Sequence, residues 1–198
     1  KALAIEHRGA VLDLPPNALP AETAVLLQVA SSSVAEGAAK AVGFGGEEEL
    51  ELLGTIDILP AGRQLAHVGG LSISEKTETQ DGVYRFRGGR WIFLGRAGSK
   101  IIIEQLGRYG LLRDSRPPEL QIAAEPGEKG DELLVRIEDG GSGIDQEGVD
   151  LLLDGLEVDS SFEAEWLQWQ PPFDLKNGRH HLEVRARDRS GNQVTREL

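Results

Sequence analysis

The 198-residue chain contains 25 glycines, nine prolines and no cysteine, and it carries a formal net charge of −12 at pH 7. Without cysteine, the chain has neither a disulfide framework nor a thiolate metal site. Residues 1–116 hold 13 Lys and Arg against 14 Asp and Glu, whereas residues 117–198 hold 8 against 19, a net charge of −11. Because phosphate binding requires clustered cations, the second half is not expected to bind nucleic acid or anionic membrane.

Short strands joined by turns are predicted throughout the chain, because glycine and proline interrupt it so often and only 5% of its residues are aromatic. No run approaches the roughly 18 apolar residues that a membrane-spanning helix requires. The chain lacks Met and begins at Lys1, so we expect a mature or excised fragment from which any signal peptide has been removed.

Strand candidates in the first half alternate apolar and polar residues or are rich in β-branched and aromatic residues. They are residues 2–13, 24–30, 55–59, 71–74, 83–86, 91–94, 100–103 and 109–112. The clearest hairpin has Gly88-Gly89 at its tip, between two aromatic-rich strands. Residues 31–46 are rich in Ser, Ala and Gly, and we expect a loop or a single helical turn there.

A domain boundary is predicted at residues 113–118, because Pro117 and Pro118 force extended backbone and make this segment a short stiff spacer. We therefore expect one domain over residues 1–114, a linker at 115–118 and a second domain over 117–198. Strand candidates in the second domain are residues 119–123, 132–138, 149–154, 156–158, 164–169, 180–187 and 194–198. Such regularly spaced short strands predict an immunoglobulin-like sandwich. The expected fold class is all-β, with two β-sandwich domains in tandem, the second immunoglobulin-like.

The last hairpin shows the strongest alternation in the chain. One face carries His180, Leu182, Val184 and Ala186, and the other carries His181, Glu183, Arg185 and Arg187. A period of two with one charged face is typical of a strand whose other face lies on a core. Arg189-Ser190-Gly191-Asn192 then has tight-turn composition, and residues 193–198 can return as the partner strand.

Five motifs in the second half resemble the bacterial immunoglobulin-like repeats of large exported proteins. They are Pro117-Pro118, residues 139–145 (DGGSGID), residues 153–155 (LDG), residues 174–180 (DLKNGRH) and residues 188–192 (DRSGN). The resemblance covers nearly all of 117–198 and implies the fold. Because such repeats occur in adhesins, peptidases and glycosidases alike, it implies no particular activity.

The first half resembles the β-sandwich module of ankyrins and netrin receptors, which also occurs in bacterial exported proteins. The residues that carry this resemblance are 9–19 (GAVLDLPPNAL), 58–62 (ILPAG), 91–95 (WIFLG) and 106–110 (LGRYG). Some modules of that type cleave themselves at a His-Phe-Ser step, but His67-Val68-Gly69 lacks the hydroxyl nucleophile here. The pair of modules also resembles the accessory part of lysostaphin-like cell-wall zinc peptidases, which implies a role beside an enzyme.

A calcium site is one interpretation of the polar residues in the second domain. The sandwich topology brings Asp139, Asp145, Asp188 and Asn192 to the end where the domain's first strand begins, near the linker. Carboxylate and amide oxygens suit Ca²⁺, which takes six to eight oxygen ligands. In the alternative, Asp139 and Asp188 cap turns by accepting hydrogen bonds from nearby backbone N–H groups. No other cofactor is expected.

His180 and His181 are adjacent in a strand, so their side chains point to opposite faces and cannot share one metal. We expect a structural role for His180 at the edge of the core, with its ring N–H bonded to a backbone carbonyl. A zinc site is not expected, because the two remaining histidines lie in the first domain.

The three tryptophans, Trp91, Trp166 and Trp169, are candidates for contact with a sugar ligand, with core filling as the alternative. Trp166 and Trp169 are three positions apart, so at most one faces the core of a regular strand. No motif of a hydrolase elbow, a phosphate-binding loop or a zinc peptidase is present, and we do not expect an enzyme.

The sequence thus predicts a structural or interaction module of a larger exported bacterial protein, which acts as a spacer or positioning unit. It is expected outside the cytoplasm, in the periplasm, on the cell surface or secreted. Its expected partners are the neighbouring domains of the parent protein, cell-wall glycan or another envelope protein. The alternative is a carbohydrate-binding accessory module of an enzyme that degrades cell wall or polysaccharide.

Overall fold

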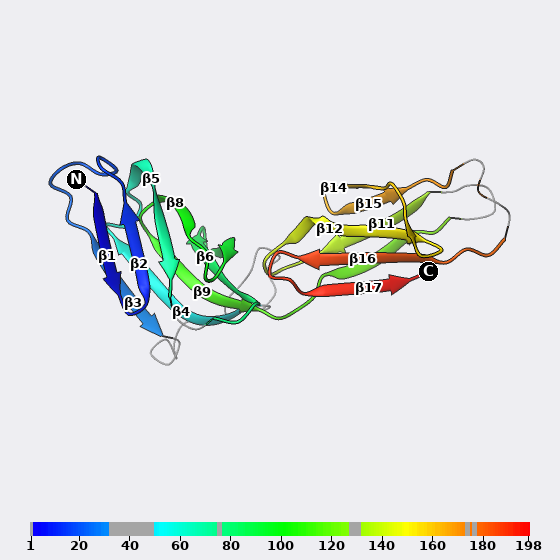
Figure 1. Cartoon of the computed structure of the whole chain (residues 1–198), viewed down its shortest axis with the longest axis horizontal. Coiled ribbons are helices and arrows are strands. Elements are labelled where there is room, and N and C mark those ends of the chain that lie inside the picture. The colour runs from blue at the N-terminus through cyan, green and yellow to red at the C-terminus, as the bar shows by residue number, and fades with distance from the viewer. Residues whose placement is uncertain (1, 32–49, 75–76, 127–131, 173–174, 176–177) are drawn as a thin grey trace. The chain divides into compact units, whose positions relative to one another are not determined.

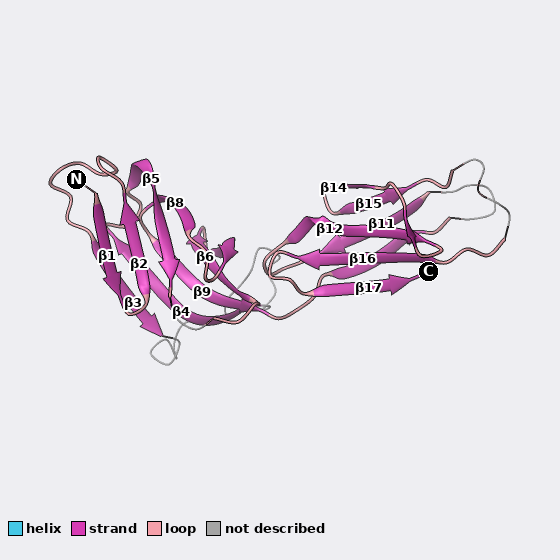
Figure 2. Ribbon diagram, in the orientation of Figure 1, coloured by secondary structure: helices cyan, strands magenta, loops and turns pink. Residues whose placement is uncertain are grey.

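The computed structural model describes residues 2–31, 50–74, 77–126, 132–172, 175 and 178–198, so residues 32–46 of the expected loop lie outside the described part. The chain divides into two compact units, Lys1–Ser115 and Arg116–Leu198. Every regular element in the described residues is a β-strand (Figure 2), which confirms the all-β fold class. None of these residues forms a helix with the length and hydropathy needed to cross a membrane.

The first unit is a sandwich of two antiparallel sheets (Figure 1). One sheet contains, in spatial order, β1 (Leu3–His7), β2 (Ala10–Leu14), β5 (Gln64–Ile73) and β8 (Ile101–Gln105). The other contains β3 (Leu26–Ser31), β4 (Leu50–Leu59), β9 (Arg108–Asp114), β6 (Asp81–Arg87) and β7 (Arg90–Arg96). The main core is built from both sheets and includes the fully buried Leu12, Ile58, Leu71 and Ile103.

A second apolar cluster lies on the other face of the five-stranded sheet. Neighbouring residues of a strand point to opposite faces, and in β9 Leu111 packs on the main core whereas Leu112 belongs to the second cluster. This cluster also contains Tyr84 and Trp91, with Phe93 packed against it. The Gly88-Gly89 tip of the β6–β7 hairpin has positive φ values of 61° and 83°, which confirms the predicted turn.

One turn and the start of one strand in the first unit differ from the sequence prediction. Residues 2–13 were expected to form one strand, but Arg8 and Gly9 adopt positive φ values of 45° and 78° and split the segment into β1 and β2. Likewise, β5 begins at Gln64, well before the predicted start at residue 71. Arg8 is not a residue that composition identifies with a left-handed turn, so the pattern alone gave no signal there.

The second unit also has two antiparallel sheets of four strands each. Their orders are β10 (Glu119–Ala124), β11 (Leu133–Glu138), β15 (Trp166–Trp169), β14 (Ser161–Glu163), and β13 (Leu156–Glu157), β12 (Ile144–Leu153), β16 (Leu182–Asp188), β17 (Gln193–Glu197). In chain order this places the first, second, sixth and fifth strands in one sheet, which is the immunoglobulin arrangement with an added edge strand in the other sheet. The second unit is therefore an immunoglobulin-like sandwich, as predicted.

Alternation within these strands builds the core of the second unit. Leu182, Val184 and Ala186 are buried, while their neighbours Glu183 and Arg185 are not. The predicted hairpin turn at Asp154-Gly155 is present between β12 and β13. Of the predicted strand 164–169 only Trp166–Trp169 is a strand, because Ala164 and Glu165 adopt positive φ values of 49° and 72° and form the turn that joins β14 to β15.

Aromatic rings on the five-stranded sheet require glycine beneath them. A Cβ added at Gly110 would lie 2.7 Å from Cζ3 of the buried Trp91 and 2.6 Å from Cδ1 of Leu112. We expect Gly110→Ala to destabilise the first unit by about 1–3 kcal/mol, because the added methyl group would overlap the Trp91 ring and the Leu112 side chain. Hydrogen exchange of peptides from residues 81–114 measures the loss of stability in the first unit separately from the second.

The matched control is Gly107→Ala, since a Cβ at Gly107 meets nothing within 4 Å and its φ lies outside the positive region. We expect this control to change stability by less than about 0.5 kcal/mol. Equal effects of the two substitutions would contradict the role of Gly110 beneath Trp91.

Candidate functional site

The β16–β17 turn is organised by a buried carboxylate. Asp188 is fully buried; its Oδ1 accepts hydrogen bonds from the backbone N–H groups of Gly191 (2.6 Å) and Asn192 (2.8 Å). Its Oδ2 accepts a hydrogen bond from the side-chain amide of Asn192 at 2.7 Å. The turn composition that the sequence showed is thus explained by donors that converge on one acid.

A second loop lies against this turn. Asp139 accepts a hydrogen bond from the backbone N–H of Gly143 at 2.6 Å, and the backbone N–H of Ser190 donates to Oγ of Ser142 at 3.0 Å. One carboxylate oxygen of Asp139 lies within 4.8 Å of one of Asp188. The structure therefore brings together Asp139, Asp188 and the neighbouring Asn192.

Asp145, the fourth residue of the calcium interpretation, is bound by β16 instead. Its Oδ2 accepts hydrogen bonds from Nη2 (2.8 Å) and Nε (3.1 Å) of Arg187. The hydrogen bonds of Asp139 and Asp188 are those that the turn-capping interpretation expects. They engage oxygens that a cation would need, and calcium binding stays a prediction.

The ring of His180 is held by a carboxylate from another hairpin. Its Nδ1 lies 2.7 Å from Oδ2 of Asp154, and Oδ1 of the same acid accepts the backbone N–H of His181 at 2.9 Å. The β12–β13 turn places Asp154 beside the start of β16, a contact across 26 residues, and a backbone-carbonyl partner for the His180 ring stays a prediction. These two hydrogen bonds hold the pKa of Asp154 below its ordinary value.

Two of the three tryptophans fill cores. Trp91 and Trp169 are each 6% exposed, and the Trp91 ring contacts Phe86 with centroids 5.0 Å apart. Trp166 lies on the other face of β15 from the buried Leu167 and Trp169, and it is partly exposed. The sugar-stacking interpretation stays a prediction, and Trp166 is the tryptophan with surface left for a ligand.

Pro117 is exposed and Pro118 is buried, in the extended segment that precedes β10.

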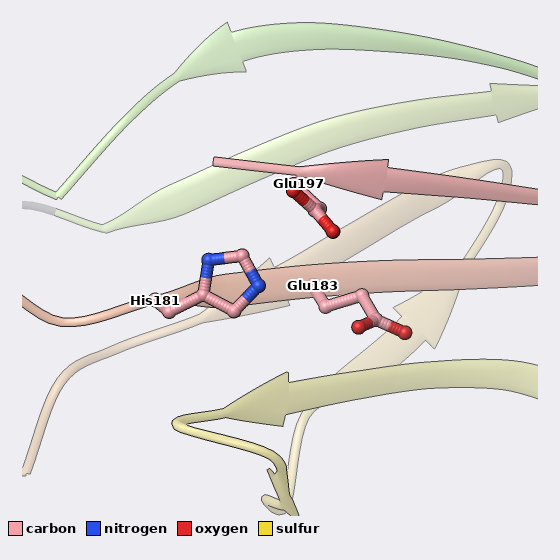
Figure 3. Close-up of side chains that lie close together, drawn as sticks. All are labelled: His181, Glu183 and Glu197. Atoms are coloured by element: carbon pink, nitrogen blue, oxygen red, sulfur yellow. The ribbon is translucent and has the colours of Figure 1, made fainter.

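Three potential metal ligands meet on the outward face of β16 and β17. Figure 3 shows Glu183 on β16, His181 directly before that strand, and Glu197 on the neighbouring β17. One ligand atom from each side chain lies within 4.8 Å of the other two. His181 and Glu197 are exposed and Glu183 is half-buried, so the group is open to solvent.

Strand register explains why these side chains are close. Glu183 and Glu197 are direct partners, and the adjacent pair Leu182 and Leu198 exchanges both backbone hydrogen bonds. Glu183 and Glu197 thus form a non-hydrogen-bonded pair, in which opposite side chains approach most closely. His181 lies two positions before Glu183, hence on the same face.

Sequence reasoning missed this group, although a signal was present. The outward position of His181 and Glu183 was predicted, but the register of the hairpin was not assigned. Val194 and Leu198 both pack against the core of the second unit, and this alternation requires Glu197 to lie on the face opposite that core. Placing Glu197 opposite Glu183 needs only that alternation and the length of the turn.

A cavity in the first unit has a different character. A cavity of about 410 Å³ lies between its sheets and is lined by Ala10, Val29, Ile56, Ile73 and Leu111, with Arg8 at its edge. Arg8 is the single ionisable residue among the described residues of the lining. A pair of groups for acid–base or nucleophilic chemistry is therefore absent from the described lining.

No protein-family model matches the chain, and no curated protein matches it. Among solved structures it is similar to the fibronectin(III)-like modules of CbhA from Clostridium thermocellum, with 16% sequence identity and a TM-score of 0.34. That match covers 69% of this chain and 84% of the other. The likeness is too distant to carry an argument. None of the comparisons supports the resemblance to ankyrin, netrin-receptor or peptidase modules.

The Asp188 turn gives a stability prediction. We expect Asp188→Ala to destabilise the second unit by about 2–4 kcal/mol, because it leaves two backbone N–H donors and the Asn192 amide without their buried acceptor. Asp188→Asn keeps one acceptor oxygen and should cost less. Denaturant titration followed by hydrogen exchange of peptides from 182–198 checks this order. Equal costs for Ala and Asn would contradict it.

The Asp154 pair gives a pH prediction. Because the folded pKa of Asp154 lies below the unfolded one, the pair stabilises the fold above about pH 4, and this contribution is lost as the pH falls through the folded pKa. We expect Asp154→Asn to lower the urea midpoint of the second unit at pH 6, with the difference from wild type shrinking toward pH 2.5. A difference that stays constant over this range would contradict the ionic role of Asp154.

Proposed function

We propose that the chain is a non-catalytic structural or interaction module of a larger exported bacterial protein, acting as a spacer or positioning unit. The observation that carries this proposal is the use of the acidic residues. The carboxylates of Asp139, Asp145 and Asp188 are engaged by turns and by a neighbouring strand, so these three acids serve to stabilise the sandwich.

Ion pairs in the first unit support the same function, because they follow strand register. Asp57 and Arg108 are direct cross-strand partners joined at 2.8 Å, and Asp81 and Arg113 are partners joined at the same distance. Asp81 is only 3% exposed, so its pairing satisfies a buried charge. Such pairs fix the register and alignment of the strands, which a spacer of constant dimensions requires.

An extracytoplasmic location and partners of the parent protein complete the proposal. The resemblance of residues 117–198 to repeats of exported proteins supports this location, together with the complete absence of cysteine. The neighbouring domains of the parent protein, cell-wall glycan or another envelope protein are the proposed partners.

A second candidate function is glycan binding as an accessory module. It is supported by the β6–β7 hairpin, where Phe86 is 40% exposed and its ring lies against Trp91, beside the exposed Arg87 and Arg90. An exposed aromatic ring backed by a buried one offers a firm stacking surface for a sugar.

One set of measurements separates these functions. The purified chain is incubated with peptidoglycan and with soluble polysaccharides, and new reducing ends and free amino groups are assayed; a spacer releases neither. Binding to the same polymers is measured by co-sedimentation and on a glycan array, and a spacer shows no saturable binding.

The variants Phe86→Ala and Trp166→Ala distinguish the glycan-binding alternative, with Phe162→Ala on β14 as a half-buried aromatic control. Saturable binding that falls at least about tenfold in Phe86→Ala or Trp166→Ala, and not in the control, would replace the spacer function with glycan binding. Product release by the purified chain would overturn the non-catalytic assignment.

A further inference from the structure

We propose that His181, Glu183 and Glu197 form a binding site for a divalent transition-metal ion, and that Zn²⁺ is the cation that their donors fit. The site lies on the outward face of the β16–β17 hairpin (Figure 3). It is separate from the Asp139–Asp188 turn, and it goes beyond the proposed spacer function.

The donors are arranged by the backbone and are largely uncommitted. Glu183 and Glu197 form a non-hydrogen-bonded cross-strand pair, so their Cβ atoms are held close by the sheet itself. Neither the His181 ring nor the Glu197 carboxylate forms a hydrogen bond or ion pair with any residue that the structure describes. Small side-chain rotations bring the three ligand atoms, which already lie within 4.8 Å of one another, around one ion.

The kinds of ligand atom select the cation. An imidazole nitrogen with two carboxylates suits Zn²⁺ and its transition-metal neighbours, whereas Ca²⁺ requires six to eight oxygens and rarely takes imidazole. Three protein ligands leave at least one position of a tetrahedral Zn²⁺ open to water. The ligand set is therefore that of an exposed zinc site with an open position.

The electrostatics of the hairpin favour a cation and also limit its affinity. Two carboxylates directly opposite each other repel, and a divalent cation between them removes that repulsion. Residues 117–198 carry a net charge of −11, which raises the local concentration of cations. Against this, Nε of Arg185 is bound to Oε1 of Glu183, so the guanidinium competes with the ion for that carboxylate.

The test is isothermal titration of the full 198-residue chain with ZnCl₂ at pH 7.5, after treatment with a chelator and desalting. We expect one saturable site. His181→Ala and Glu197→Gln should each weaken binding at least about tenfold, because each removes a ligand. His67→Ala, at an exposed histidine of the first unit, should leave the affinity unchanged.

Arg185→Ala provides a further arm that a merely adventitious histidine contact would not reproduce. It removes the competing cation, so we expect Zn²⁺ to bind roughly threefold more tightly. A tenfold excess of Ca²⁺ should not displace Zn²⁺. Circular dichroism checks that each variant is folded, and His181→Gln replaces His181→Ala if the latter lowers the unfolding temperature.

Several results would overturn the proposal. These are the absence of saturable Zn²⁺ binding, affinity that His181→Ala and Glu197→Gln leave unchanged, weaker binding in Arg185→Ala, and displacement by Ca²⁺. The first two would show that the three side chains do not act together, and the last two that the bound ion does not rely on the imidazole and the carboxylates of this face.

Discussion

The closure of the β16–β17 hairpin by Asp188 is the constraint on which the second unit depends. A fully buried carboxylate must be met by internal donors, and the two backbone N–H groups and the Asn192 amide fix the turn that follows it. The turn length then determines the pairing of β17 with β16. A slip of one residue would move Glu197 to the core and Val194 to solvent, so one buried acid determines both the core and the outward face of the hairpin.

In the first unit the corresponding constraint is the close packing of large side chains, and not the pairing of a buried charge. Its five-stranded sheet has apolar side chains on both faces: Leu112 is buried in the second cluster, and the partly buried Leu111 packs against the main core. The second cluster fits large rings only where a strand has no side chain. Gly110 lies beneath Trp91, and Gly82 lies beneath Phe93. Glycine at these positions serves close packing and not a turn, since neither has a positive φ.

The strands of this protein could be predicted from the sequence, but several turns could not. Alternation identified the buried face of β16, and Gly88-Gly89 and Asp154-Gly155 identified hairpins, because glycine tolerates the left-handed backbone that such turns require. Ala164 and Glu165 adopt the same backbone without any residue that favours it. The antiparallel pairing of β14 with β15 imposes that conformation, and tertiary constraints of this kind leave no local pattern.

In the candidate sites, too, some features could be predicted from the sequence and others could not. Turn capping by Asp139 and Asp188 was a stated alternative because an aspartate side chain accepts hydrogen bonds from backbone N–H groups a few residues further along the chain. Asp154, the carboxylate that binds His180, was not identified from the sequence, since it belongs to a different hairpin. Glu197 was not identified at all, because its neighbours depend on hairpin register. Contacts within a few residues could be predicted, whereas contacts between strands depend on a register that had not been assigned from the sequence.

The carboxylates of Asp188 and Glu197, both in the second unit, differ in whether they can bind an external ligand. Burial removes water from the Asp188 carboxylate, so the chain itself supplies the donors, and the lone pairs that hold the fold are then withdrawn from any external ligand. Glu197 is exposed, keeps its lone pairs hydrated, and contributes little to folding. Stabilising the fold and offering ligand atoms are thus competing uses of a carboxylate. In the second unit Asp188 stabilises the turn, whereas Glu197 on the exposed face of β16 and β17 keeps its oxygens available as ligand atoms.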